Sequence, residues 1–294
     1  MKASILMPVY NAEKYLAESV QSILNQTFKD FELIIINDGS TDSSLEIAKN
    51  INDARINILN LEKNIGDALA MNKGIGKASG VYIFRMDSDD IASPTKIEKQ
   101  IKYMDEHPDC VVCGTWIQSF GRQNTLYDYA SESANIKSNL LFFNCLAHPS
   151  VGIRKKFLND TGLLYTKEFP HAEDFDLLTK ISTIADIHNI PEVLLKYRTH
   201  QEQIGSKFRA EQIQSAYTIM KRQITNFLGV LTLNQEKACQ GILNILIVKK
   251  NTAEEEKLVD QLFQDIIECN NKKNTFDKTA LNYSIDYLKR KAIK

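Results

Sequence analysis

The sequence contains no long hydrophobic run, few cysteines and almost no net charge. Its apolar stretches fall short of the ~20 residues that a membrane-spanning helix needs, and the first is broken at Pro8, unlike a signal peptide. The five cysteines are odd in number, which argues against a disulfide framework. A formal net charge of −1 offers no general attraction to nucleic acid. These absences predict a cytoplasmic protein with free thiols and no nucleic-acid partner.

Glycine-rich phosphate loops are also missing. The turn at residues 8–12 contains no glycine, whereas a sugar nucleotidyltransferase would need a glycine-rich, basic loop there. The glycines within residues 74–80 have the wrong spacing for a dinucleotide-binding loop and lie late in a predicted helix. Cys110 and Cys113 have the spacing of a zinc or redox motif, but no second pair exists. We interpret both as core cysteines of a strand.

Strand and helix signals alternate through the first hundred residues. Short apolar runs predict strands, and apolar residues at helical spacing predict helices between them. The predicted strands are 3–9, 31–36, 55–61 and 81–86, and the predicted helices are 12–26, 45–51, 65–77 and 94–106. This order predicts an α/β fold with a mostly parallel sheet flanked by helices. Further on, strands are predicted at 111–117, 149–153, 185–190 and 193–197, and a helix at 172–183.

The last part of the chain has a different character. No proline follows Pro191, and apolar stripes at helical spacing recur from about Lys207 onward. Residues 207–294 carry 15 Lys and Arg against 10 Asp and Glu, so the rest of the chain is acidic. We predict a catalytic domain at residues 1–206 and a helical C-terminal region at 207–294. Three interpretations of this region stay open: peripheral contact with an anionic membrane, a homo-oligomer interface, or helices packed on their own domain.

Three carboxylates follow the fourth predicted strand, at Asp87, Asp89 and Asp90. Like charges this close raise one another's pKa, and a divalent cation removes that cost. Mg²⁺ and Mn²⁺ prefer oxygen ligands. The sequence therefore predicts a cation site, with an ordinary acidic turn as the alternative.

Other polar residues stand at comparable positions. Asp38 ends the second predicted strand, next to the fourth in the predicted sheet, where it could bind a base or ribose or only cap its own turn. Glu173 and Asp174 begin a predicted helix, where they could supply a general base or only complement the helix dipole. His200 ends the last predicted strand and is either a metal ligand or a surface histidine. Because ligands bind at the carboxyl ends of parallel strands, we expect a common site.

Taken together, these motifs resemble the inverting family 2 glycosyltransferases, which have the GT-A, Rossmann-like fold. The resemblance runs from Ile5 to about His200. Residues 84–94 look most like exopolysaccharide transferases of the amylovoran type, which include galactosyl- and glucosyltransferases. The segments that carry the resemblance are 5–11, 26–28, 32–42, 64–66, 72–74, 78–80, 87–90, 148–149, 173–174 and 197–200.

The resemblance implies a role for each matched residue. Asp38 would bind the uracil of a UDP-sugar, and Asp87 would contact the ribose or the sugar. The residues implied to line the nucleotide-sugar are Pro8, Tyr10, Asp38, Asn64, Gly66, Asn72, Asp87 and Ser88. Asp89 would ligate the Mn²⁺ or Mg²⁺ that bridges the two phosphates, and His200 would lie near the diphosphate or complete the metal shell. Asp174 would be the catalytic base, with Glu173 beside it.

The implied reaction moves a hexose, with UDP-Gal or UDP-Glc favoured, to a saccharide or lipid-linked saccharide during surface polysaccharide or glycan synthesis. A base on the face opposite the leaving diphosphate gives inversion in one displacement. The only tryptophan is Trp116, so the Gln-x-x-Arg-Trp motif of processive relatives is absent. Two alternatives stay open: a non-catalytic sugar-nucleotide-binding or assembly protein on the same fold, and a sugar nucleotidyltransferase. The expected location is the cytoplasm, and peripheral contact with the inner face of the membrane stays open.

Overall fold

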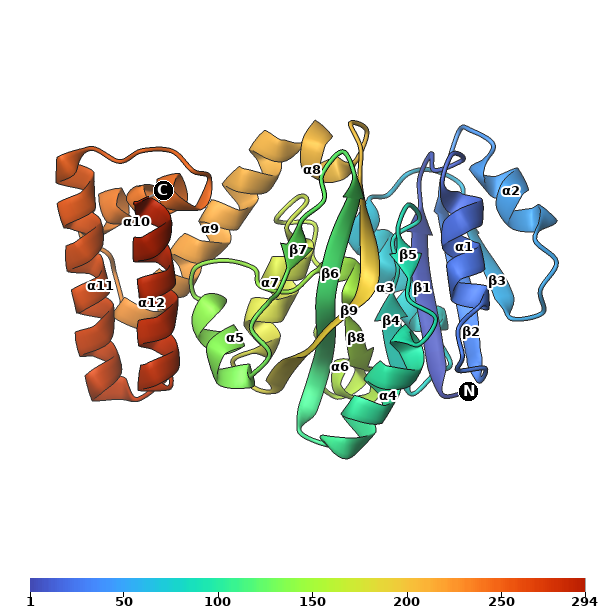
Figure 1. Cartoon of the computed structure of the whole chain (residues 1–294), viewed down its shortest axis with the longest axis horizontal. Coiled ribbons are helices and arrows are strands. Elements are labelled where there is room, and N and C mark those ends of the chain that lie inside the picture. Colours follow the sequence, from blue (N-terminus) through green and yellow to red (C-terminus); the bar gives the residue numbers. More distant parts are fainter. Residues whose placement is uncertain (294) are drawn as a thin grey trace.

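The computed structural model, which describes residues 1–293, contains a nine-stranded sheet with helices on both faces, followed by a group of C-terminal helices (Figure 1). The strands are β1 Ala3–Val9, β2 Phe31–Asp38, β3 Ile56–Leu61, β4 Tyr82–Arg85, β5 Ile91–Ala92, β6 Cys110–Gly121, β7 Leu126–Tyr127, β8 Gly152–Arg154 and β9 Asp186–Thr199. The helices of the sheet domain are α1 Leu16–Leu24, α2 Ser44–Asn50, α3 Asp67–Lys77, α4 Lys96–Glu106, α5 Ser133–Asn139, α6 Lys155–Thr161 and α7 Glu173–Ile181. The C-terminal helices are α8 Ile204–Lys207, α9 Arg209–Leu228, α10 Leu233–Leu246, α11 Ala253–Lys273 and α12 Lys278–Ala292.

The sheet has the order β3-β2-β1-β4-β8-β6-β9-β5, with β7 paired to β6. Its first four strands are parallel, as the alternation of strands and helices predicts. Beyond β4 the sheet becomes mixed, because β8 runs antiparallel to both β4 and β6, while β9 runs parallel to β6. The α/β prediction is confirmed. The prediction that Asp38 lies on a strand next to the fourth is wrong, because β1 separates β2 from β4.

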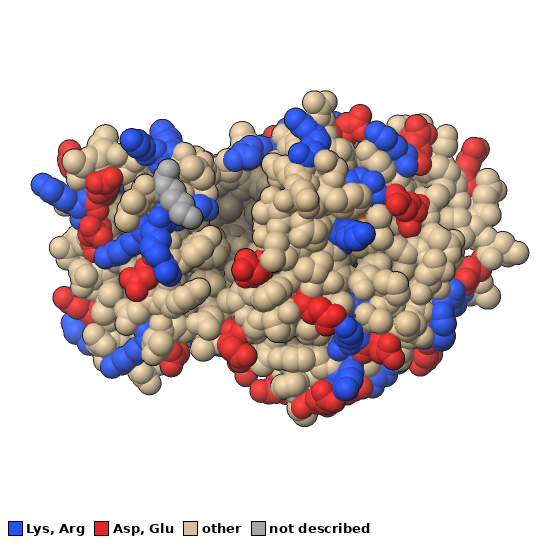
Figure 2. Space-filling view, viewed as in Figure 1, with Lys and Arg blue, Asp and Glu red and all other residues tan. Residues whose placement is uncertain are grey.

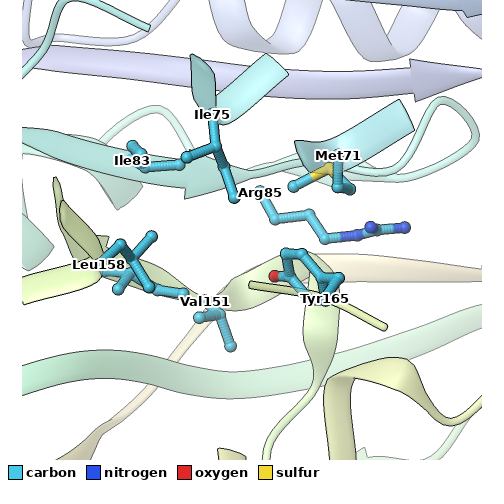
Figure 3. A pocket seen from close by; sticks show the side chains of 8 residues that line it. Met71, Ile75, Ile83, Arg85, Val151, Leu158 and Tyr165 are labelled. Carbon is cyan, nitrogen blue, oxygen red and sulfur yellow. The ribbon is translucent and has the colours of Figure 1, made fainter. Parts of the chain in front are cut away.

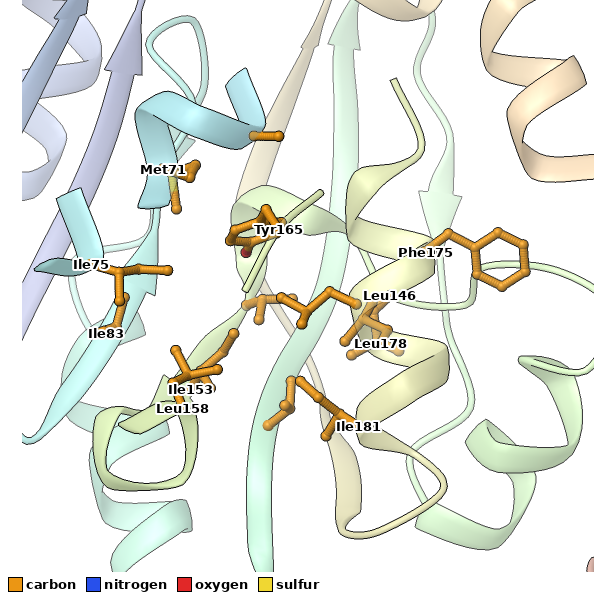
Figure 4. Close-up of a cluster of buried hydrophobic side chains, with 14 of the residues drawn as sticks. Met71, Ile75, Ile83, Leu146, Ile153, Leu158, Tyr165, Phe175, Leu178 and Ile181 are labelled. Atoms are coloured by element: carbon orange, nitrogen blue, oxygen red, sulfur yellow. The ribbon is translucent and has the colours of Figure 1, made fainter. Parts of the chain in front are cut away.

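Alternation along β1 and β2 explains why both strands are apolar over most of their length; the polar residues near their starts, Ser4 and Glu32, bond to each other at 2.7 Å. Ile5 and Leu33 face one side of the sheet, where they pack with residues of α1 and α4. Leu6 and Ile34 face the other side, where they pack with α3 and α7. Figure 4 shows this second cluster, with Met71 and Ile75 of α3 opposite Leu178 and Ile181 of α7. Strands covered on both faces carry no polar alternation.

The second half of the sheet departs from the predicted elements. The two strands predicted at 185–190 and 193–197 are one strand, β9, in which Pro191 and Glu192 form a bulge against β6. A bulge accommodates proline because the residue there needs no ladder hydrogen bond. The strand predicted at 149–153 is instead a short 3₁₀ turn at His148–Ser150 followed by β8. The helices predicted from residues 12 and 94 begin later, at Leu16 and Lys96.

The C-terminal helices have their own apolar core. Residues of α9 to α12 bury a cluster that includes Ile224, Ile242, Phe263 and Leu288. Two of these helices begin with capping boxes, α10 at Thr232 and α11 at Thr252. The same cluster contains Leu141 and Phe142 of the preceding domain, which tie the two parts together. Within residues 1–293, no helix is long and apolar enough to cross a membrane. The division at residue 206 stays a prediction, and residue 294 lies outside the described residues.

Candidate active site

The predicted site residues gather at the carboxyl ends of the strands. Asp38 is the last residue of β2, Asp87 follows β4, and His200 follows β9. The turn after β1, which begins at Tyr10, lies beside them, because β1 and β2 pair up to Val9 and Asn37. In an open α/β sheet this edge is where ligands bind.

Three carboxylates form the centre of this edge. Oxygen atoms of Asp87, Asp89 and Asp90 all lie within 4.8 Å of one another. Burial and the neighbouring Asp89 raise the pKa of Asp90 well above its usual range. Burial also raises the pKa of Asp87 to about 6, although Arg85 opposes the shift. Ser88 is half-buried between them. Carboxylates held this close together are an unfavourable arrangement that a cation would relieve.

β9 contributes the other wall of this cluster. His200 Nε2 lies 2.9 Å from Asp89 Oδ2, and the backbone N–H of Arg198 donates to Asp90 Oδ1 at 2.8 Å. Asp90 therefore anchors β9. It is not the N-cap of α4, the next helix along the chain, because that position is Thr95. Among the described residues, Asp90 Oδ2 and His200 Nδ1 are buried without a hydrogen-bond partner. A bound ion or water would satisfy such atoms.

Arg85 connects the carboxylate cluster to the rest of the site. Its Nε donates to Asp87 at 2.8 Å, and its two terminal nitrogens donate to Asp67 at 2.8 and 3.2 Å. Figure 3 shows the stem of Arg85 passing between Met71 and Tyr165, with the guanidinium directed away from the apolar lining. Burial would raise the pKa of the Asp67 carboxyl, but Arg85 outweighs this effect and lowers it.

Asp38 holds the loop before α3. Its two carboxylate oxygens accept the backbone N–H groups of Ile65 at 2.8 Å and Gly66 at 3.0 Å. Asn64 is exposed on the same loop. Gly39 has φ +69°, and a Cβ there would lie 2.5 Å from the backbone nitrogen of Asn64. The structure therefore brings Asp38, Asn64 and Gly66 together, with the next residue, Asp67, bonded to Arg85.

Pro8 and Tyr10 lie across from Asp38 at the end of β1. Pro8 is half-buried, whereas Tyr10 is 52% exposed. The turn between them and the Asp38 loop is fixed by hydrogen bonds, because Asn11 donates its N–H to Ser40 and accepts the N–H of Thr41. An exposed ring beside a buried carboxylate suits a planar ligand.

Asn72, on α3, makes its side-chain hydrogen bonds to a different segment of the chain. Its side-chain amide donates to the backbone oxygen of Tyr165 at 2.8 Å and accepts the N–H of the same residue at 3.1 Å. The Tyr165 hydroxyl in turn lies 2.9 Å from His148 Nε2. Asn72 thus holds the Tyr165 segment against Arg85 through its side chain.

Glu173 and Asp174 begin α7 and occupy different environments. Burial and the neighbouring Asp67 and Asp174 carboxylates raise the pKa of Glu173 to about 8. Asp174 Oδ2 accepts the side-chain amide of Asn144 at 2.8 Å. Burial raises the pKa of Asp174 too, while the Phe175 N–H, Arg85 and Asn144 oppose the shift. At neutral pH Glu173 therefore carries a proton.

The model of glycosyl transferase family 2 matches residues 4–158. The chain belongs to this family. It is 33% identical to an uncharacterized glycosyltransferase of Haemophilus influenzae over 79% of this chain and 76% of that one. It is 36% identical to the O-antigen biosynthesis glycosyltransferase WbnJ of Escherichia coli, over 78% of this chain and 93% of that one.

Two kinds of solved structure share the fold of this glycosyltransferase. One is S. aureus TarS 1–349 in complex with UDP-GlcNAc, with a TM-score of 0.66, 20% identity, and coverage of 100% of this chain and 88% of that one. The other is the mannosyltransferase PcManGT of Pyrobaculum calidifontis in complex with GDP-Man and Mn²⁺, with a TM-score of 0.61, 13% identity, and coverage of 100% and 86%. The predicted GT-A fold is confirmed, and the family membership argues against the nucleotidyltransferase alternative.

The donor atoms of this glycosyltransferase fit a hard divalent cation. Asp87, Asp89 and Asp90 supply clustered carboxylate oxygens, and His200 supplies a ring nitrogen beside them. Such oxygen-rich sets suit Mg²⁺ and Mn²⁺. The buried Oδ2 of Asp90, which lacks a partner among the described residues, points to the same conclusion.

Sequence reasoning missed four residues of the site: Asp67, Arg85, Asn144 and Tyr165. Arg85 carried a signal, because a charged residue within an otherwise apolar strand needs a buried partner. Asp67 directly follows Gly66, which the family resemblance includes, and is the acidic residue at the start of α3 that pairs with Arg85. Asn144 lies in a segment without periodicity, so nothing in the sequence marked it.

Proposed function

We propose that this protein transfers a sugar from a UDP-sugar to a saccharide acceptor, with inversion, using a divalent cation. One observation carries the proposal: the carboxylates of Asp87, Asp89 and Asp90 converge at a strand end and connect through Arg85 and Asp67 to the acids of α7. The donor site and the base of one reaction would then share a single rigid network. The structures of TarS with UDP-GlcNAc and the O-antigen role in the name of WbnJ support a UDP-sugar and a polysaccharide product.

The nucleotide would lie between the ends of β1 and β2. Tyr10 offers a ring face to the base, in a pocket bordered by Pro8, and Asp38 offers carboxylate lone pairs beyond the two backbone bonds it already accepts. Asn64 and Gly66 border the same space. Asn72 contributes indirectly, by positioning Tyr165.

The diphosphate would lie over the carboxylate cluster, with Asp87 and Ser88 toward the ribose and sugar. A bound Mn²⁺ or Mg²⁺, held by Asp89 with the neighbouring carboxylates and His200, would neutralise the charge that grows on the leaving diphosphate. Arg85 fixes the orientation of Asp87 through its Nε. Pairing with Arg85 also limits the repulsion between Asp87 and Asp89.

Asp174 is the proposed base. Asn144 orients its carboxylate, and burial raises its pKa toward the value that efficient proton transfer needs. It would remove the proton of the acceptor hydroxyl as that oxygen attacks the sugar from the face opposite the diphosphate. Glu173 is protonated at neutral pH and lies near Asp67, to which its O–H can donate, so its role would be to position the network. Inversion of an α-linked UDP-hexose gives a β-linked product.

The experiment is a donor screen with UDP-Gal, UDP-Glc and their N-acetyl forms, in Mn²⁺ and in EDTA, with transfer and hydrolysis both followed. Asp174→Asn is expected to lower transfer by about 10²- to 10⁴-fold while UDP binding stays unchanged. Asp89→Ala is expected to weaken metal-dependent UDP binding. A protein that neither transfers nor hydrolyses any UDP-sugar, and that ignores EDTA, would favour the non-catalytic binding protein.

The setting of the reaction is a separate proposal. The C-terminal region carries 15 Lys and Arg against 10 Asp and Glu, a positive excess that supports contact with an anionic membrane where lipid-linked acceptors lie. Self-association through the same helices is the competing proposal. Sedimentation with phosphatidylserine vesicles at low and high salt, beside light scattering of the free protein, separates the two.

A further inference from the structure

The last helix of the chain lies close to the proposed base. The ring of Tyr287 on α12 lies 5.5 Å, centroid to centroid, from the ring of Phe143. The next residue, Asn144, donates its side-chain amide to Asp174 at 2.8 Å. Two consecutive residues therefore connect the C-terminal helices to the group that would accept the proton.

The position of α12 is firmly fixed. Ser284, one turn before Tyr287, donates its hydroxyl to Asn139 Oδ1 at 2.8 Å in a buried contact. Leu281 and Leu288 of the same helix are buried in one cluster with Phe142. Tyr287 nevertheless leaves 40% of its surface exposed. The Tyr287 ring is therefore carried by a well-packed helix and faces solvent.

A second tyrosine, Tyr129, is half-buried and packs against the apolar cluster that contains Cys145 and Phe175, the residues that follow Asn144 and Asp174 in the chain. Burial raises the pKa of the Tyr129 hydroxyl, and Asp174 and Tyr287 both lie close enough to add to that shift. The ring of Tyr127 stacks against Tyr129 at 6.1 Å. Figure 2 shows that the surface is hollowed between the C-terminal helices and the sheet domain. Aromatic side chains from both parts of the chain therefore approach one another near Asp174.

We propose that Tyr287, Phe143 and Tyr129 form the wall of a binding subsite for a neutral saccharide, which presents the acceptor hydroxyl to Asp174. The inference rests on the proposed function and adds the residues that select the acceptor. Rings with a hydroxyl tip match the alternating C–H faces and hydroxyls of a sugar, and no charged side chain belongs to the wall. The C-terminal region would then be part of the acceptor site as well as a packing partner.

The test compares Tyr287→Ala and Tyr287→Phe with a matched control, Tyr283→Ala. Tyr283 lies one turn earlier on the same helix and is 54% exposed, and the aromatic contact it makes is with Arg290 of its own helix. Saturation-transfer NMR with octyl β-glucoside, octyl β-galactoside and octyl β-N-acetylglucosaminide, in UDP and Mg²⁺, measures saccharide binding without requiring turnover. UDP affinity, donor hydrolysis and the KM for the best of these acceptors are measured in parallel.

Tyr287→Ala is expected to lose most of the saturation transfer to the sugar protons and to raise the acceptor KM by about 3- to 10-fold. UDP affinity and donor hydrolysis stay within about twofold of wild type, Tyr287→Phe retains most of the binding, and Tyr283→Ala behaves as wild type. Two results with the wild type would overturn the inference: saturation of the octyl protons alone, or no saturation of any probe. Two results with the variants would also overturn it: an unchanged acceptor KM in Tyr287→Ala, or equal losses in Tyr283→Ala. Failure of wild type to bind UDP would instead refute the proposed function.

Discussion

Glu173→Gln offers a sharp test of how the acids of α7 divide their work. The Glu173 carboxyl has a pKa of about 8, raised by burial and by the Asp67 and Asp174 carboxylates, against a usual value of 4.5. It therefore holds a proton at neutral pH and can donate it in a hydrogen bond to the neighbouring Asp67 carboxylate. Glutamine keeps the volume and can donate an N–H to Asp67, so the variant mimics the state that the native protein already occupies.

The effect on stability follows from proton linkage. A group whose pKa is raised in the folded state stabilises the fold fully below its unfolded pKa, here 4.5, and loses that contribution as pH rises through about 8. As pH rises across this window, the unfolding free energy of the wild type is expected to fall by up to about 1.4 kcal/mol per pH unit. The variant lacks this titrating group and does not show that loss. Urea denaturation of both proteins at pH 5.5, 7 and 8.5 measures the difference.

Activity gives the second half of the test. Glu173→Gln is expected to keep transfer at pH 7 within a few-fold of wild type, since the residue accepts no proton there. Asp174→Asn serves as the matched comparison, because it makes the same chemical change one residue along α7. A Glu173→Gln variant that loses transfer as completely as Asp174→Asn, or whose stability follows pH as the wild type does, would refute the assignment.

Three further changes test the residues that support the site. Arg85→Met leaves Asp67 and Asp87 without their buried cation and is expected to cost about 3–5 kcal/mol of unfolding free energy. Urea denaturation measures this cost beside the exposed control Arg290→Met, and an unchanged midpoint would contradict the role of the Arg85 ion pairs. Gly39→Ala, at φ +69° with a Cβ 2.5 Å from the Asn64 backbone, is expected to cost about 1–3 kcal/mol and to weaken UDP binding, whereas Gly76→Ala, where a Cβ meets nothing within 4 Å, should leave UDP binding intact. Thr232→Ala removes the cap of α10 and is expected to cost about 1 kcal/mol with no change in UDP affinity.

The parallel half of the fold was predictable because its signals are local. β1 and β2 are mostly apolar runs, and the helix between them, α1, carries apolar residues at helical spacing. β5 and β7 have two residues each, too few for any periodicity. β9 was divided in the prediction because Pro191 reads as a break, whereas a bulge against β6 carries the strand past it.

The site was predictable where strand ends alone place a residue. Asp38, Asp89 and His200 lie at the sheet edge because their strands end there. Contacts across elements could not be read in the same way. That Arg85 reaches Asp67 on α3 depends on how the helix packs, and that Tyr287 reaches Phe143 depends on the fold of the 143 residues between them. The prediction that Asn72 borders the nucleotide-sugar could not include its contact with Tyr165, to which the Asn72 amide makes two hydrogen bonds.

The central claim is that Asp87, Asp89 and Asp90 form a cation-dependent site for a nucleoside diphosphate. Isothermal titration of UDP into the protein, once with Mn²⁺ and once with EDTA, tests it most directly. The account predicts binding in Mn²⁺ that weakens at least about tenfold in EDTA, a loss of about 1.4 kcal/mol or more, and a response to Mn²⁺ that Asp89→Ala abolishes. Equal UDP affinity in Mn²⁺ and EDTA, or a wild-type response to Mn²⁺ in Asp89→Ala, would contradict it.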